Sequence, residues 1–84
     1  MPIVPTSVTV SDDGSSTSIR YDFKNGYGAS VIRKPYSYGG SEGLWELAVT
    51  HNGAITYDTP ITGDVIGWLT QSEVIAHLLK IKEL

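Results

Sequence analysis

The chain has 84 residues, of which 40% are hydrophobic and 18% charged, and it contains no cysteine. This length fits one domain and is too short for an enzyme built from two lobes around a cleft, and the composition is that of a chain that folds around a packed core. The net charge of −3 disfavours a nucleic-acid partner, and disulfides are excluded. We therefore expect a single domain over residues 1–84 that holds no metal or other cofactor.

The start of the chain predicts no export signal. Residues 1–5 carry no basic stretch and no long apolar run, and nowhere do 18 apolar residues follow one another. We expect a soluble, cytoplasmic protein that makes no membrane contact.

The first predicted element is a strand over residues 6–11, in which Val8 and Val10 alternate with polar residues. The segment Asp12-Asp13-Gly14 predicts a turn, because two adjacent carboxylates lack the further oxygen ligands of a calcium loop. This turn leads into a second strand over residues 18–24. We expect the two strands to form a hairpin.

A first Asn-Gly pair, Asn25-Gly26, predicts the next hairpin, and its loop length decides which side chains share a face. A two-residue loop splits the apolar residues between both faces. A three-residue loop that starts at Lys24, with Gly26 in a left-handed bulge position, gathers them on one face. The pairs are then Ile19 with Val31, Tyr21 with Ala29, and Phe23 with Tyr27.

The glycine-rich segment over residues 39–43 joins this hairpin to the next one and has basic and aromatic neighbours. Tyrosine and arginine are enriched at interface hot spots, and loops bounded by glycine mould to a partner. We therefore predict a partner-binding set made of Arg33, Lys34, Tyr36, Tyr38, Glu42 and Trp45. Under an alternative hypothesis of small-molecule binding, the pocket is expected beneath the same loop.

A second Asn-Gly pair predicts another hairpin, from a strand over residues 44–50 to one over residues 54–58. By the same argument we favour a three-residue loop, His51-Asn52-Gly53, which places Val49 opposite Ile55 and Leu47 opposite Tyr57. Pro60 ends the second strand, since proline cannot donate to a ladder. Residues 62–67 then predict a tight turn or one helical turn.

The C-terminal segment predicts a helix from Gln71 to Leu84. It contains no glycine or proline, and Thr70-Gln71-Ser72-Glu73 matches the capping box. Val74, Leu78 and Ile81 form a stripe that is expected to bury itself on the sheet. The predicted fold class is α+β: an antiparallel meander of four to five strands with one C-terminal helix packed on its apolar face.

Catalytic chemistry has little support in the sequence. No nucleophile elbow or phosphate-binding loop is present, and Asp58 and Asp64 are isolated from other metal ligands. His51 is expected to be a solvated turn residue, and His77 is expected to form an exposed helical pair with Glu73. We predict that the protein is not an enzyme.

Three segments carry a resemblance to a known group of proteins: Asn25-Gly26-Tyr27-Gly28-Ala29-Ser30-Val31, then Gly43-Leu44-Trp45-Glu46-Leu47-Ala48-Val49, then Tyr57-Asp58-Thr59-Pro60-Ile61-Thr62-Gly63-Asp64-Val65. The pattern resembles small proteins of tailed bacteriophages, especially those that infect actinobacteria. This resemblance implies a phage origin and an accessory role during infection, in the host cytoplasm. It supplies no catalytic residues.

The resulting hypothesis is a non-enzymatic accessory protein that binds a host or phage protein and modulates or inhibits a host or defence protein. One alternative is single-stranded nucleic-acid binding through Arg20, Arg33, Lys34 and the tyrosines. Another is a small-molecule-binding domain. A homodimer is also left open if Tyr36 and Tyr38 are exposed beside an apolar patch, and it is expected to serve function rather than folding, because the predicted core suffices for a monomer.

Overall fold

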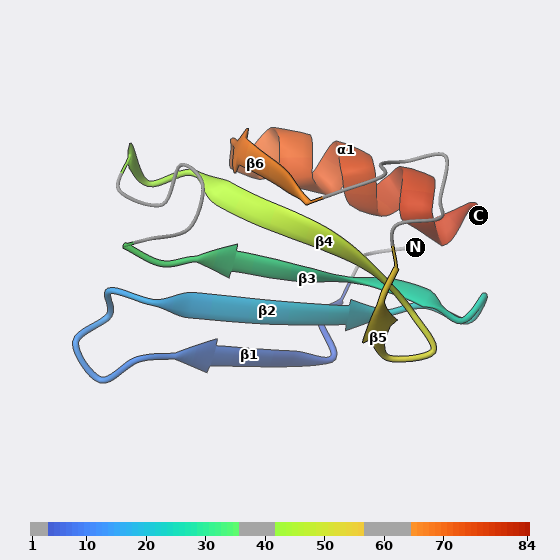
Figure 1. Cartoon of the computed structure of the whole chain (residues 1–84), viewed down its shortest axis with the longest axis horizontal. Coiled ribbons are helices and arrows are strands. Elements are labelled where there is room, and N and C mark those ends of the chain that lie inside the picture. The colour runs from blue at the N-terminus through green and yellow to red at the C-terminus, as the bar shows by residue number, and fades with distance from the viewer. Residues whose placement is uncertain (1–3, 36–41, 57–64) are drawn as a thin grey trace.

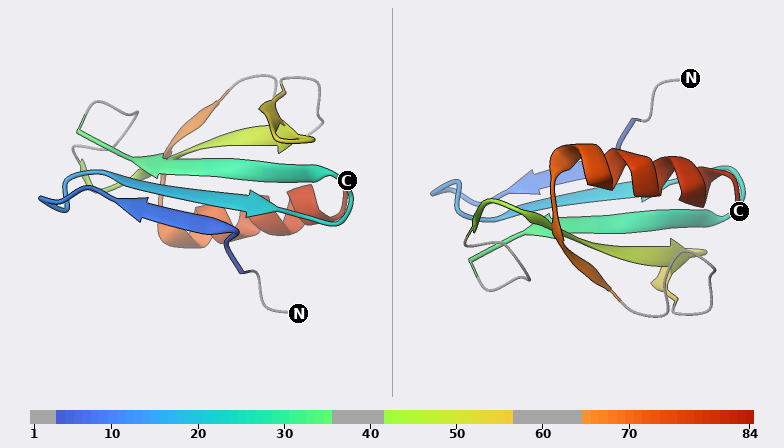
Figure 2. Two further views of the ribbon diagram at one scale, coloured as in Figure 1. Left: turned by 90° about the horizontal axis from the view of Figure 1, so that it is seen from below. Right: turned by 90° about the horizontal axis from the view of Figure 1, so that it is seen from above.

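The computed structural model describes residues 4–35, 42–56 and 65–84. Its strands form one antiparallel sheet in the order β1-β2-β3-β4-β5, and β6 pairs with β4 (Figure 1). The helix α1 runs along the strands on one side of this sheet (Figure 2). The predicted α+β architecture is confirmed. The elements are β1 (Ser7–Val10), β2 (Thr17–Asp22), β3 (Tyr27–Arg33), β4 (Trp45–His51), β5 (Ala54–Ile55), β6 (Ile66–Leu69) and α1 (Gln71–Lys82).

The hairpin of β2 and β3 has the predicted register. Ile19 lies opposite Val31. The backbone N–H of Phe23 donates to the carbonyl of Tyr27 (2.8 Å), and Gly26 has a φ of 86°. This is the three-residue loop with a left-handed glycine that the apolar pattern predicts.

The predicted register of the second Asn-Gly hairpin is wrong. Thr50 lies opposite Ile55, so the loop is the two-residue turn Asn52-Gly53, with φ values of 51° and 88°. Two left-handed residues in sequence make a type I′ turn, whose twist matches that of the strands, and asparagine tolerates this conformation. Ile55 therefore lies on the face away from the helix and is 53% exposed. Its predicted neighbour Tyr57 lies outside the described residues.

A strand also replaces part of the predicted turn before the helix. β6 pairs with β4 at the end opposite β5, with Trp45 facing Leu69 and Leu47 facing Ile66. Between these two pairs, β6 contains two intervening residues, Gly67 and Trp68, where β4 contains one, so β6 has a β-bulge at Gly67-Trp68. β5 and β6 thus share the outer edge of β4.

The helix begins as predicted. The Thr70 N–H donates to Glu73 Oε1 (3.0 Å), and the Glu73 N–H donates to Thr70 Oγ1 (3.3 Å). The stripe of α1 packs on the sheet, where β3 and β4 supply most of the apolar partners. The buried core consists of Ala29, Val31, Leu47, Val49, Leu69, Val74, Leu78 and Ile81.

Candidate functional site

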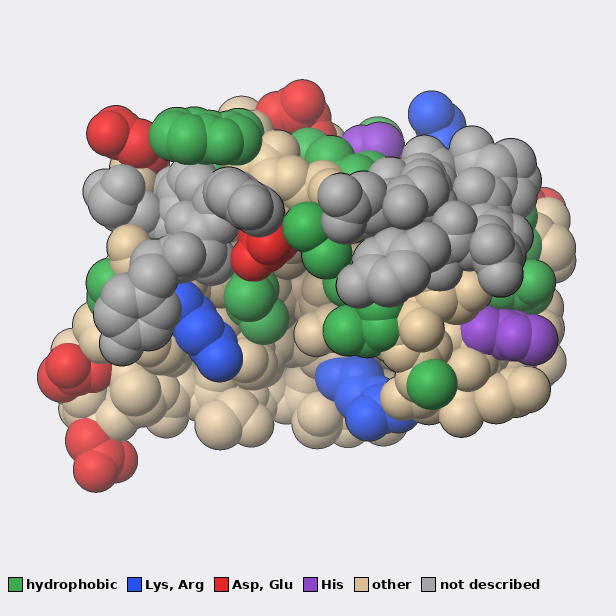
Figure 3. Space-filling view, viewed as in Figure 1, with side chains coloured by type: hydrophobic (Ala, Val, Ile, Leu, Met, Phe, Trp, Pro, Cys, Tyr) green, Lys and Arg blue, Asp and Glu red, His purple; other side chains and the backbone are tan. Residues whose placement is uncertain are grey.

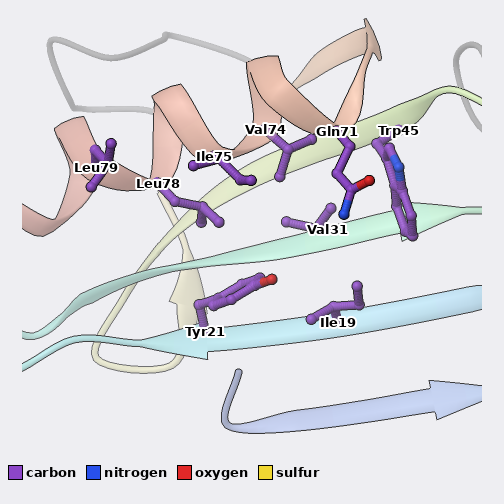
Figure 4. Close-up of a pocket in the computed structure, with 9 residues that line it drawn as sticks. All are labelled: Ile19, Tyr21, Val31, Trp45, Gln71, Val74, Ile75, Leu78 and Leu79. Atoms are coloured by element: carbon purple, nitrogen blue, oxygen red, sulfur yellow. The ribbon is translucent and has the colours of Figure 1, made fainter. Parts of the chain in front are cut away.

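An apolar groove lies between α1 and the strands β2 and β3 (Figure 4). Its volume of about 440 Å³ is in the range of small-ligand sites. Figure 4 shows Ile19 and Tyr21 on the side of β2 that faces α1. The groove is lined by Ile19, Tyr21, Val31, Trp45, Gln71, Val74, Ile75, Leu78 and Leu79.

The groove exists because one helix is too narrow to cover the sheet. Five neighbouring strands span roughly 20 Å, whereas a helix with its side chains is about 10–12 Å wide. α1 packs mainly against β3, β4 and β6, so β2 is only partly covered and β1 is exposed. Val8 and Val10 lie on the same face as Ile19 and are 54% and 55% exposed. They extend the apolar floor to the edge of the sheet.

Two of the predicted partner-binding residues meet beside this groove. Arg33 lies opposite Thr17, which places it on the same sheet face as Val31. Its guanidinium carbon lies 4.6 Å from the centre of the Trp45 ring, which is within cation–π range. Between described residues, the ion pair present is Arg20 with Asp22, so no described carboxylate neutralises Arg33. The end of the groove at Trp45 therefore carries a positive charge.

The other predicted partner-binding residues are not brought into this site by described contacts. Glu42 is exposed, and Lys34 is half-buried directly after β3. Tyr36 and Tyr38 lie outside the described residues, as does most of the glycine-rich segment. The pocket expected beneath that segment therefore falls outside the described ranges, and the groove is formed by other elements.

An exposed tryptophan on β6 was missed by the sequence reasoning. Trp68 is 59% exposed and has a φ of 59°. A left-handed conformation is rare for a bulky side chain, and here it occurs within the β-bulge. No local sequence signal predicts it, because the bulge depends on how β6 pairs with β4.

The basic residues of the nucleic-acid alternative do not form one stripe. Arg20 follows Ile19 in β2, so it lies on the face away from the helix, whereas Arg33 lies on the helix side. Arg20 Nε is 3.3 Å from the Asp22 carboxylate, and its Nη2 donates to the Gly53 carbonyl (3.4 Å). The blue side chains in the view of Figure 3 are correspondingly scattered. The placement of Arg20 and Arg33 on opposite faces of the sheet and the ion pair of Arg20 with Asp22 both weaken the nucleic-acid alternative.

The two histidines match expectation only in part. His51 is exposed, as expected, but it belongs to a strand rather than to a turn. His51 is the last residue of β4, and its ring stacks on Tyr27 with centroids 4.3 Å apart. His77 is half-buried rather than exposed, and its Nδ1 is buried and has no hydrogen-bond partner among the described residues. The N–H of Thr70 lowers the pKa of the Glu73 carboxyl, mainly as part of the helix cap. These contacts belong to folding, and they do not join a nucleophile to a base.

The segment Asp12-Asp13-Gly14 forms a turn, as predicted, and Asp13 stabilises it. The Asp13 carboxylate accepts hydrogen bonds from the Ser15 N–H (3.0 Å), the Ser15 hydroxyl (2.8 Å) and the Ser11 hydroxyl (2.7 Å). These donors, led by the Ser15 N–H, lower the pKa of Asp13 to about 2. Within residues 4–35, 42–56 and 65–84, no three metal-ligating side chains cluster.

Comparisons with known proteins do not place the chain in a family. No family model, curated protein or solved structure matches it. In the part of the chain that the structure describes, no helix is long and apolar enough to span a membrane.

Proposed function

We propose that this protein is a non-enzymatic binding domain whose apolar groove holds a segment of another protein. The observation that carries the proposal is the open groove beside α1, which Ile75 and Leu79 line while about half exposed and whose floor on β2 is only partly covered. Contiguous exposed apolar surface on a small soluble domain marks an interaction site more often than a structural need. The half-buried pair of Arg33 and Trp45 adds two residue types that are enriched in hot spots.

The groove favours a partner segment with apolar side chains and one acidic group. Apolar side chains fit the floor formed by Ile19 and Tyr21, and a carboxylate fits the guanidinium of Arg33 at the end of the groove. Such a segment belongs, under this proposal, to a host or phage protein in the cytoplasm of the infected cell. The resemblance to small phage proteins supports an accessory role, in which binding modulates or inhibits the partner.

The test is capture of partners from a host lysate with matched variants on one helix. Ile75→Lys and Leu79→Lys place a charge in the groove at positions that are about half exposed. Ala76→Lys is the control, since it adds the same charge at an exposed neighbouring position that does not line the groove. We expect the wild type and Ala76→Lys to enrich the same protein, and both groove variants to lose it.

Thermal melting of all four proteins shows whether the variants remain folded. Enrichment that survives both groove substitutions contradicts the proposed site, and the absence of any enriched protein contradicts the proposed function. A gel shift with single-stranded DNA or RNA at about 50 mM salt tests the nucleic-acid alternative, because electrostatic binding is strong under this condition.

A second candidate, small-molecule binding, is favoured by the volume of the groove. About 440 Å³ lined mainly by apolar side chains suits a small apolar ligand that carries an anionic group near Arg33. Thermal shift with fractionated cell extract separates the two candidates. A small ligand at 100 times its dissociation constant adds about 2.7 kcal/mol to stability, and the Leu79→Lys variant should lose that shift.

A further inference from the structure

The free edge of β1 lacks the features that usually protect an edge strand. All four residues, Ser7 to Val10, are exposed, and none is charged or proline. No described strand pairs with the outer side of β1. Natural sheets block such edges with lysine, proline, bulges or a covering element, because unpaired backbone groups recruit another strand. β1 is therefore open to pairing.

The hydrogen-bonding pattern identifies the backbone groups that are available. The Ser11 N–H donates to the Ser16 carbonyl (2.9 Å), so the backbone N–H and C=O groups of Ser11 face the β2 side of the hairpin. Along an antiparallel ladder, residues whose backbone groups bond to the neighbouring strand alternate with residues whose backbone groups face away from it. The backbone groups of Ser7 and Thr9 therefore also face β2. The N–H and C=O groups of Val8 and Val10 point outward.

We propose that two copies of this chain pair through their β1 strands in antiparallel orientation, with Thr9 of each copy on the two-fold axis. In this register, Val8 of each copy lies opposite Val10 of the other. Since the outward groups belong to these two residues, each valine pair exchanges two backbone hydrogen bonds, and the junction contains four. A Val8-centred register would place a single such pair on the axis and is less favourable.

The sequence around Thr9 suits a second copy rather than an unrelated strand. It is symmetric in residue type, with valine on each side and serine beyond, at Ser7 and Ser11. Valine pairs form on the helix side, a threonine pair forms on the other side, and both types of cross-strand pair are favourable. No like charges from the strand meet across the axis. The surface is thus complementary to itself, as an isologous two-fold interface requires.

The dimer extends the sheet and brings the two grooves together. A two-fold axis perpendicular to the sheet keeps both helices on the same side, so Val8 and Val10 of both copies form a shared apolar floor between the two helices. This inference does not rest on the proposed function. Groove variants at Ile75 or Leu79 test partner binding and leave the β1 junction unchanged.

Cysteine cross-linking tests the register, because the chain has no cysteine of its own. Directly opposite residues in a non-hydrogen-bonded pair have Cβ atoms about 4.5–5.5 Å apart, within reach of a disulfide after a small adjustment. We expect Thr9→Cys to form a disulfide dimer under mild oxidation. Ser7→Cys is the matched control, since it is exposed on the same face but lies far from its own copy in this register.

Sedimentation of the wild type tests the dimer without a cross-link. We expect the mass to rise with concentration from that of one chain to twice that value. Val10→Pro removes one outward N–H from each copy without removing a bond to β2, so it should abolish the increase of mass with concentration. Val10→Thr keeps this N–H and should retain the increase. Cross-linking of Ser7→Cys as rapid as that of Thr9→Cys overturns the register. If β1 accepts only a strand of another protein, the wild type stays monomeric at all concentrations, and this result overturns the proposed dimer.

Discussion

The two Asn-Gly hairpins share a dipeptide and differ in structure. At Asn25-Gly26 the loop has three residues, and only the glycine is left-handed, whereas at Asn52-Gly53 the loop has two residues and both are left-handed. The turns touch, since the Asn52 N–H donates to the Gly26 carbonyl (2.7 Å). A dipeptide therefore permits a set of turns, and its surroundings select one.

The first turn is selected by contacts with the helix and the core. Asn25 Nδ2 donates to the carbonyls of Ile81 (3.0 Å), Lys82 (3.2 Å) and Leu84 (3.2 Å), while its Oδ1 accepts from the Tyr27 N–H (2.9 Å). Asn25 thus caps the end of α1, which would otherwise leave carbonyl groups without partners. Among the described residues, the second turn has no hydrogen bond to the helix: its Asn52 N–H donates to the first turn, its Gly53 carbonyl accepts from Arg20, and it precedes a strand of only two exposed residues. It takes the two-residue geometry that its Asn-Gly dipeptide favours.

The largest expected difference between the hairpins comes from Gly28→Ala. A Cβ at Gly28 would overlap the backbone carbonyl of Tyr21 and crowd Thr50 Oγ1, neither of which is a flexible side-chain end. We expect a loss of about 3 kcal/mol or more in the free energy of unfolding. Ala54→Gly, in the exposed β5 of the other hairpin, should cost at most about 1 kcal/mol. Urea denaturation measures both, and equal losses would contradict the difference in packing.

Substituting each asparagine by aspartate tests the capping role directly. Asn25→Asp removes the donors to three carbonyls and places a carboxylate at the negative end of the helix dipole, so we expect a loss of about 2 kcal/mol. Asn52→Asp should change stability by no more than about 0.5 kcal/mol, because Asp-Gly also forms the type I′ turn. Chemical denaturation at pH 7 checks the pair. If Asn25→Asp leaves the free energy of unfolding unchanged, the end of the helix does not depend on the cap by Asn25.

The turn glycines should behave alike, in contrast to the asparagines. Gly26 and Gly53 have φ values of 86° and 88°, and alanine in this region costs about 1–2 kcal/mol. The added Cβ would lie 3.1 Å from Asn52 Oδ1 in the first case and 3.0 Å from Arg20 Nη2 in the second. Both neighbours are side-chain ends. Thermal unfolding of Gly26→Ala and Gly53→Ala should therefore give similar losses.

The smallest expected effect lies in the remaining hairpin, at Asp13. Its folded-state pKa of about 2 is below the ordinary 3.8, so the unfolded chain binds more protons in that range. The contribution of Asp13 to stability is full above about pH 4 and is lost as the pH falls through about 2. Asp13→Asn should remove this pH dependence. Comparing melting temperatures of the two proteins from pH 6 down to pH 2 tests it, and parallel profiles would contradict the assignment.

Sequence reasoning succeeded where the signal was local or where apolar residues had to share a face. The Thr70 and Glu73 cap requires only four consecutive residues, and the register of β2 with β3 follows from the pairing of Ile19 with Val31. It failed for Ile55, because the argument assumed that β5 contributes to the core. It also gave no indication of β6, whose four residues become a strand only against β4.

The candidate site was predicted only in part, for the same reason. Arg33 and Trp45 were selected for their chemistry, and their contact follows from the pairing of β3 with β4. The groove depends on where α1 lies across the sheet, and this position results from the burial of Val74, Leu78 and Ile81 together. Local hydrogen bonding and apolar periodicity within the sequence determined the strands β1 to β4 and the helix α1. Tertiary packing alone decided the strand β6, the cap of α1 by Asn25 and the partly covered strand β2 beside the helix, because each of them depends on residues far apart in the chain.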